Sequence, residues 1–119
     1  MSAQKRFFGI RHAVNGLGLF LRSESNGRMH AIATVLVIAL AAWLRCTAIE
    51  WALLAIVTGM VWLAEMLNTA IEKIMDYVQP EIHPQVKWIK DVAAGAVLAA
   101  TITAIAVGGF VFVPKLLAL

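Results

Sequence analysis

Residues 92–113 read VAAGAVLAATITAIAVGGFVFV, and these 22 consecutive residues include no charged side chain. An α-helix rises about 1.5 Å per residue, so this stretch is long enough to cross a bilayer core of about 30 Å. We therefore predict a transmembrane helix over residues 92–113.

The rest of the chain is also strongly apolar. Of its 119 residues, 61% are hydrophobic and only 14% are charged, whereas a typical soluble domain has about 25% charged residues. One soluble core of this size cannot bury so much apolar surface, and the chain is too hydrophobic to be disordered. We predict a single integral-membrane domain over residues 1–119. The lone cysteine, Cys46, excludes an intrachain disulfide and a cysteine-cluster metal site.

Two more stretches predict membrane spans. Residues 29–44 contain only His30 as an ionisable group, and residues 51–64 contain none. The helical pattern of the second stretch continues through polar residues to about residue 78. The predicted fold class is therefore all-α, with three transmembrane helices in residues 29–119. A cleaved signal peptide is not expected, because the first 28 residues lack a compact apolar run followed by a cleavage site.

Residues 1–28 have an amphipathic pattern. Apolar residues recur at helical spacings of three and four, at Phe7, Ile10, Val14, Leu17 and Leu21. Basic residues occupy another arc of the same helix. This pattern predicts a helix that lies in the membrane interface, with its basic side toward lipid phosphates. A turn is expected in the small polar residues 23–27, before the first span.

The distribution of Lys and Arg predicts the orientation of the spans. Five of the ten precede the first span, and three lie in or beside the connection between the second and third spans. Only Arg45 and Lys115 fall on the other side. Positive residues concentrate in cytoplasmic segments, so the amino terminus and residues 73–90 are expected in the cytoplasm and the carboxyl terminus outside. No basic run interleaved with aromatic residues indicates nucleic-acid binding.

A polar stripe runs along the cytoplasmic half of the second predicted span. Its members fall within about 100° of one another on a helix and are Glu65, Asn68, Thr69, Glu72 and Asp76. By helical rise, Glu65 lies about 22 Å from Glu50, inside the inner leaflet, and Glu72 about 33 Å, near the head groups. An acid at mid-span depth costs about 2.5–3.5 kcal/mol and usually marks a functional site. The simpler alternative is a protonated Glu65 that bonds to a neighbouring helix.

Two further polar groups are expected at the same cytoplasmic interface. One is Glu24 with its neighbours up to His30, and the other is the pair Lys90 and Asp91. Each has a simpler interpretation as a helix cap or an interface anchor. Together with Glu72, however, Glu24 and a lysine suit a magnesium-bound polyphosphate, because Mg²⁺ is usually held by one or two carboxylates and by substrate phosphates. The chain has no phosphate-loop or dinucleotide-binding motif.

Three motifs resemble the small bacterial integral-membrane lipid kinases, the prokaryotic diacylglycerol kinase and undecaprenol kinase family. They are AEMLNTAIE at residues 64–72, KDVAAGAVL at residues 90–98, and Glu24-x-Asn26-x-Arg28-x-His30. The third motif is more similar to the undecaprenol kinase branch than to the Gram-negative diacylglycerol kinases. The resemblance covers nearly the whole chain, because the length, the three spans and the preceding amphipathic helix agree with it.

The resemblance implies a homotrimer in the bacterial inner membrane, with active sites between neighbouring protomers. It implies ATP with Mg²⁺ as the phosphate donor and a membrane lipid alcohol, undecaprenol or diacylglycerol, as the acceptor. Glu65 resembles the general base for the lipid hydroxyl, and Glu24 and Glu72 resemble the metal-binding carboxylates. The residues implied to contact the nucleotide and its metal are Lys90, Asp91, Asn68, Glu24 and Glu72.

Two other functions compete with that of a lipid kinase. In a small oligomeric proton-coupled transporter, Glu65 would be an intramembrane proton site. A transporter gives no reason for Glu24, Lys90 and Asp91 to meet at one aqueous edge. A structural or regulatory membrane oligomer is disfavoured by the polar stripe.

Overall fold

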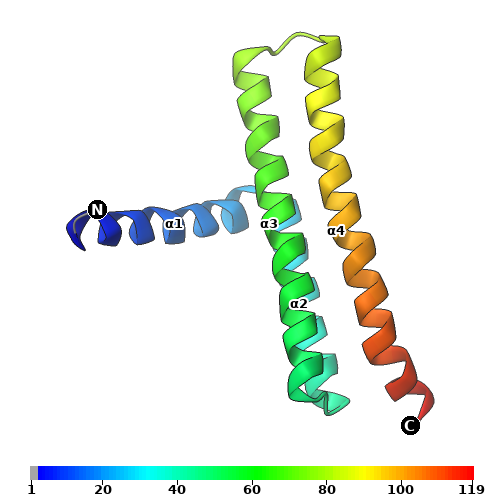
Figure 1. Cartoon of the computed structure of the whole chain (residues 1–119). Coiled ribbons are helices and arrows are strands. Elements are labelled where there is room, and N and C mark those ends of the chain that lie inside the picture. The colour runs from blue at the N-terminus through cyan, green and yellow to red at the C-terminus, as the bar shows by residue number, and fades with distance from the viewer. Residues whose placement is uncertain (1–2) are drawn as a thin grey trace. The chain divides into compact units, whose positions relative to one another are not determined.

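The computed structural model describes residues 3–119, and this part of the chain folds into four α-helices. They are α1 (Ala3–Ser23), α2 (Ser25–Trp43), α3 (Ala48–Val78) and α4 (Pro84–Leu117), coloured from blue to red in Figure 1. The predicted all-α fold is confirmed. Residues 1 and 2 of the predicted surface segment lie outside the described range.

By length and composition, α2, α3 and α4 could each cross a membrane. All three predicted spans are therefore confirmed as helices, but their boundaries differ from the prediction. α3 begins at Ala48 rather than at residue 51, and α4 runs from Pro84 to Leu117 rather than over residues 92–113. The prediction ended each span at the first charge, whereas a helix continues into the polar interface wherever its backbone bonds and caps persist.

The chain divides into two compact units, one up to Ala33 and the other Thr34–Leu119. In the first unit, only Glu24 separates α1 from α2, so the turn is shorter than predicted. The Arg28 guanidinium donates hydrogen bonds to the carbonyl oxygens of Leu21 (3.3 Å) and Arg22 (2.9 Å). Arg28 thereby satisfies carbonyls that the end of α1 would otherwise leave unpaired. Ile10 and Val14 are exposed on α1, as an interfacial helix requires.

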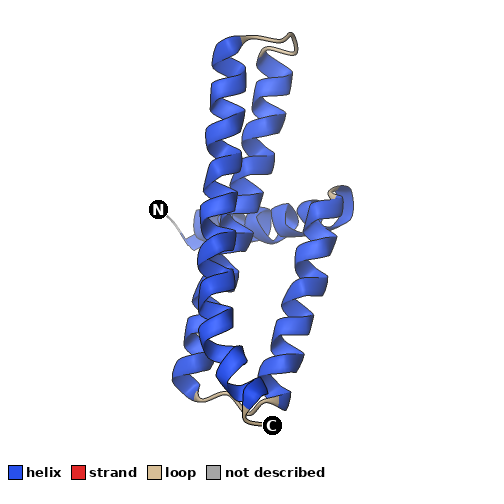
Figure 2. Cartoon of the chain, turned by 90° about the vertical axis from the view of Figure 1, so that its right-hand side faces the viewer, coloured by secondary structure: helices blue, strands red, loops and turns tan. Residues whose placement is uncertain are grey.

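In the second unit, α3 and α4 pack along each other as a helical hairpin (Figure 2). At one end, Thr47 caps α3 in a capping box with Glu50, and the Glu50 carboxylate also forms an ion pair with Lys115 of α4 at 3.0 Å. At the other end, the His83 side chain accepts a hydrogen bond from the Gln85 amide, and Pro84 opens α4. Both ends of the hairpin are therefore fixed by local caps.

The buried core is small and lies near the Glu50 end of this unit. Ala41 of α2, Leu54 of α3 and Val111 of α4 form one buried cluster. Farther along, the Trp62 indole donates a hydrogen bond of 2.8 Å to the Thr34 hydroxyl and joins α3 to α2. Most large apolar side chains of the described helices remain exposed. Such surfaces are compatible with lipid or with other copies of the chain, but not with water.

The link between α1 and α2 yields a first prediction, because Gly27 leaves no room for a side chain. A Cβ atom at Gly27 would lie 2.5 Å from the carbonyl oxygen of Phe20. We expect Gly27→Ala to lower the stability of the first unit by about 1–3 kcal/mol through overpacking, measured by hydrogen exchange of the α1 amides in detergent micelles. Gly16→Ala is the control, because a Cβ placed there would meet nothing within 4 Å beyond the adjoining backbone of its own helix. Equal protection in both variants would contradict the prediction.

Candidate active site

The polar stripe lies on one continuous helix, as predicted, and passes from buried to exposed along α3. The Glu65 side chain is buried, with 6% of the residue exposed, and Asn68 is 9% exposed. One turn and two turns farther on, Glu72 and Asp76 are exposed. Because Glu65 and Glu72 are seven residues apart, about 10 Å of helix separates the buried acid from the exposed one. A ligand held at Glu72 would therefore have to extend along the helix to meet a group held at Glu65.

Asn68 lies between these two acids, and only one of the two polar atoms of its side chain has a hydrogen-bond partner. Its Nδ2 atom donates a long hydrogen bond of 3.5 Å to Oε1 of Glu72. Its Oδ1 atom is buried and has no hydrogen-bond partner among residues 3–119. A buried acceptor without a partner costs about 1–3 kcal/mol, so such a group calls for an explanation, such as a catalytic role or a bound water or ion. The free Oδ1 atom can accept a hydrogen bond from a bound molecule.

Lys90 and Asp91 are adjacent in sequence but do not form an ion pair with each other. The Lys90 ammonium forms an ion pair with Asp76 of α3 at 2.5 Å, and Asp91 forms one with Lys87 at 2.5 Å. Consecutive residues point about 100° apart on a helix, whereas residues four apart share a face. The spacing of Lys87 and Asp91 could have revealed their pair. The Lys90–Asp76 pair depends on how the connection returns α4 to α3, and no sequence signal indicated it.

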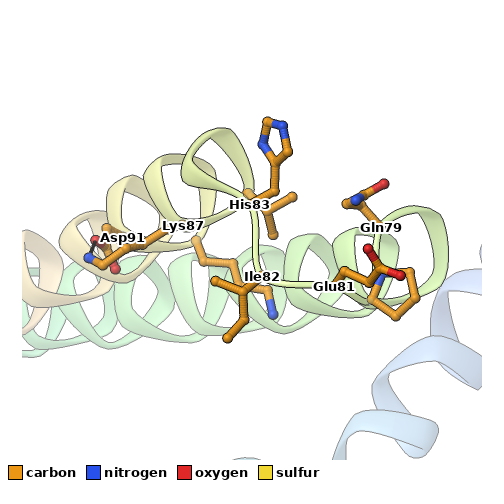
Figure 3. A pocket seen from close by; sticks show the side chains of 9 residues that line it. Gln79, Glu81, Ile82, His83, Lys87 and Asp91 are labelled. Carbon is orange, nitrogen blue, oxygen red and sulfur yellow. Dashed lines mark hydrogen bonds and ion pairs between the residues drawn. The ribbon is translucent and has the colours of Figure 1, made fainter.

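A pocket of about 240 Å³ lies where the connection meets the start of α4 (Figure 3). Its lining includes both predicted nucleotide-binding residues of α4, Lys90 and Asp91, together with Lys87. Sequence reasoning missed the contribution of the connection itself, which supplies Gln79, Glu81, Ile82 and His83 to the lining. The pocket therefore offers two ammonium groups and several hydrogen-bonding groups to a polar ligand.

The expected metal site combines residues of two separate units. Glu72 belongs to the second unit, and Glu24 lies at the junction of α1 and α2 in the first. Within residues 3–119, no three His, Cys, Asp or Glu side chains are grouped so as to hold a metal ion. The exposed Glu72 carboxylate fits Mg²⁺ in the manner of nucleotide sites, where one or two carboxylates share the ion with phosphates. The shared role of Glu24 and Glu72 stays a prediction.

Comparisons with known proteins agree on one family. The sequence model of the prokaryotic diacylglycerol kinase family matches residues 11–112. The chain is 41% identical over 111 residues to a diacylglycerol kinase of Synechocystis sp., and the match covers 92% of this chain and 63% of that protein. It is 36% identical over 112 residues to the undecaprenol kinase of Bacillus subtilis, with 93% and 91% covered.

A third relative is the diacylglycerol kinase of Escherichia coli, 35% identical over 83 residues, with 70% of this chain and 68% of that protein covered. The chain thus spans just under two thirds of the Synechocystis protein and most of the Bacillus protein. These relatives are kinases, which supports a lipid kinase over the transporter considered from the sequence. Both relevant kinase names occur among them, so the matches do not decide between the two lipids.

The half-satisfied amide yields a second prediction. Asn68→Leu replaces a buried polar group with an apolar one of similar size, and we expect thermal stability in detergent to stay unchanged or rise, because an unpaired acceptor is removed. Thr34→Val is the contrasting variant: it deprives the Trp62 indole of its acceptor and should cost about 1–3 kcal/mol. If Asn68→Leu is as destabilising as Thr34→Val, the amide is structural and not held for a ligand.

Proposed function

This chain belongs to the prokaryotic diacylglycerol kinase family of lipid kinases, and we propose that it transfers the terminal phosphate of ATP to the hydroxyl of undecaprenol or diacylglycerol at the cytoplasmic face of the membrane. The observation that carries this proposal beyond the family is the stripe on α3, which joins a buried carboxyl group to an exposed one. A lipid alcohol enters such a site from the bilayer, and a nucleotide enters it from water. One helix that carries both a buried and an exposed carboxyl group can contact both substrates.

Glu65 is the proposed general base. It takes the proton of the lipid hydroxyl while the hydroxyl oxygen attacks the terminal phosphorus and ADP leaves. Glu65 is buried against the rest of the chain and does not lie on an exposed apolar face, which supports a role in a site. Asn68, between Glu65 and Glu72, positions the reacting groups through its free Oδ1 atom. Phosphoryl transfer depends mainly on positioning and charge neutralisation, so a bundle of helices can support it.

The nucleotide is proposed to bind at the exposed end of the stripe. Lys90 binds phosphate oxygens, and Asp91 supports the nucleotide end of the site from the same pocket. Glu24 and Glu72 would hold Mg²⁺, which neutralises polyphosphate charge when bound. We propose a homotrimer in which Glu24 of one protomer and Glu72 of a neighbour hold the same ion. The exposed apolar faces of the helices are compatible with it.

The orientation of the site follows from the positive residues. Residues 1–28 and residues 73–90 together carry eight of the ten Lys and Arg residues, and such segments stay in the cytoplasm. We therefore place the exposed end of the stripe at the cytoplasmic face of the bacterial inner membrane, where ATP is present. The Glu50–Lys115 end of the hairpin and the carboxyl terminus then lie outside.

The role of Glu65 leads to a third prediction. With purified protein in mixed micelles, radiolabelled ATP and either undecaprenol or diacylglycerol, we expect Glu65→Gln to reduce kcat at least 100-fold, because a general base contributes about 10²–10⁴-fold. Glu50→Gln is the matched control on the same helix and should stay within twofold of the unmodified chain. Undiminished transfer by Glu65→Gln, or transfer to neither lipid by the unmodified chain, would refute the proposal. The ratio of the two lipid rates identifies the acceptor.

The metal-binding role yields a fourth prediction. Chelation of Mg²⁺ should abolish transfer, and Glu72→Gln should raise the Mg²⁺ concentration needed for half-maximal activity about tenfold or more, because one of two carboxylate ligands is lost. Activity of Glu72→Gln should then recover partly at high Mg²⁺, whereas that of Glu65→Gln should not. A Glu72→Gln enzyme with an unchanged Mg²⁺ requirement would remove Glu72 from the metal site.

A further inference from the structure

The ion pair between Asp76 and Lys90 joins the end of α3 to the first turns of α4 and has no part in the roles assigned above. Oδ1 of Asp76 lies 2.5 Å from the Lys90 ammonium, across 14 residues of sequence. The Lys90 side chain is 35% exposed and that of Asp76 is 65% exposed. The Lys90 side chain is thus mostly covered, while the side chain of its partner Asp76 is mostly exposed.

The position of this pair along α3 relates it to the proposed site. Asp76 is four residues beyond Glu72, about 6 Å along the helix and on the same stripe. By pairing with Asp76, the ammonium of Lys90 is brought from α4 to the exposed end of the stripe. A lysine side chain has four flexible carbons and strongly hydrated donors. Without a partner, its ammonium would spread over many positions in water.

The neighbouring charges do not hold Lys90 in this way. Asp91, next in sequence, is occupied by Lys87. The pocket beside the connection is lined by Lys87, Lys90 and Asp91, so Lys90 is the lysine that bridges from this pocket to α3. Because an ammonium group has three N–H donors, Lys90 can keep its bond to Asp76 and still donate to a phosphate oxygen.

We propose that Asp76 is a positioning residue for nucleotide binding: it holds the Lys90 ammonium beside Glu72 before ATP arrives. This inference rests on the proposed function, in which Lys90 binds phosphate. Asp76 itself touches neither the phosphate nor the lipid. Loss of Asp76 weakens the binding of MgATP, because part of the binding energy is then spent on ordering the lysine side chain.

The test is steady-state kinetics of Asp76→Asn in mixed micelles. The expected result is an increase of about threefold to fivefold in KM for MgATP, the upper range for an exposed ion pair, with kcat within twofold. Asp76→Glu keeps the carboxylate and should restore KM to within twofold of the unmodified chain. Glu50→Gln is the matched control, because it breaks the other ion pair between α3 and α4. It should leave KM unchanged, while its thermal midpoint falls about as much as that of Asp76→Asn.

The outcomes separate this inference from the proposed function. An unchanged KM in Asp76→Asn, or a lowered KM that would reveal Asp76 as a competitor of phosphate, overturns the inference. Equal effects of Asp76→Asn and Glu50→Gln on KM would also overturn it, since the pair would then only clamp the hairpin. Lys90→Met should lose most activity. If Lys90→Met is inactive while Asp76→Asn has normal kinetics, the inference fails but the proposed function stands. If Lys90→Met is fully active, Lys90 does not bind phosphate, and both that assignment and the inference fail.

Discussion

Hydrocarbon offers no hydrogen-bond partners to the peptide backbone, and this constraint shapes everything else in the molecule. A lipid-exposed span must satisfy its N–H and C=O groups within itself, which favours a continuous helix. A phosphate-binding loop exposed to hydrocarbon is therefore disfavoured. The polar chemistry of the chain is instead arranged as side chains along helices, and α3 carries most of it. The result is a candidate site whose side chains become more exposed along one helix, from the buried Glu65 to the exposed Glu72.

The same constraint explains what the sequence could reveal. Hydropathy and helical spacing predicted the helices and the stripe on α3, because a continuous helix fixes which side chains share a face. The helix ends were predicted less well, since Thr47 and His83 cap α3 and α4 beyond the apolar residues. The turn at Glu24 was predicted as longer than it is, because the close packing of Gly27 on the Phe20 carbonyl is not visible in composition.

Contacts between helices were the least predictable part. Lys90 and Asp91 are neighbours in sequence, yet each forms an ion pair with a different residue. The partner of Lys90 is Asp76 of α3. Such a pair depends on the length of the connection and the rotation of α4, neither of which has a periodic signature. The roles of Glu24, Glu65, Asn68, Glu72, Lys90 and Asp91 come from motif similarity. The structure adds burial and pairing for residues of the second unit, and the relation of Glu24 to them stays a prediction.

The capped start of α4 has a consequence for how the chain can vary in length. His83 and Pro84 set where the helix begins, and Lys90 follows six residues after Pro84. One residue added or removed between Pro84 and Lys90 would rotate Lys90 by about 100° away from Asp76. Residues added before His83 would only enlarge the connection, at a small cost in loop entropy. Insertions before the cap are therefore easier for the fold to accept than insertions or deletions after it.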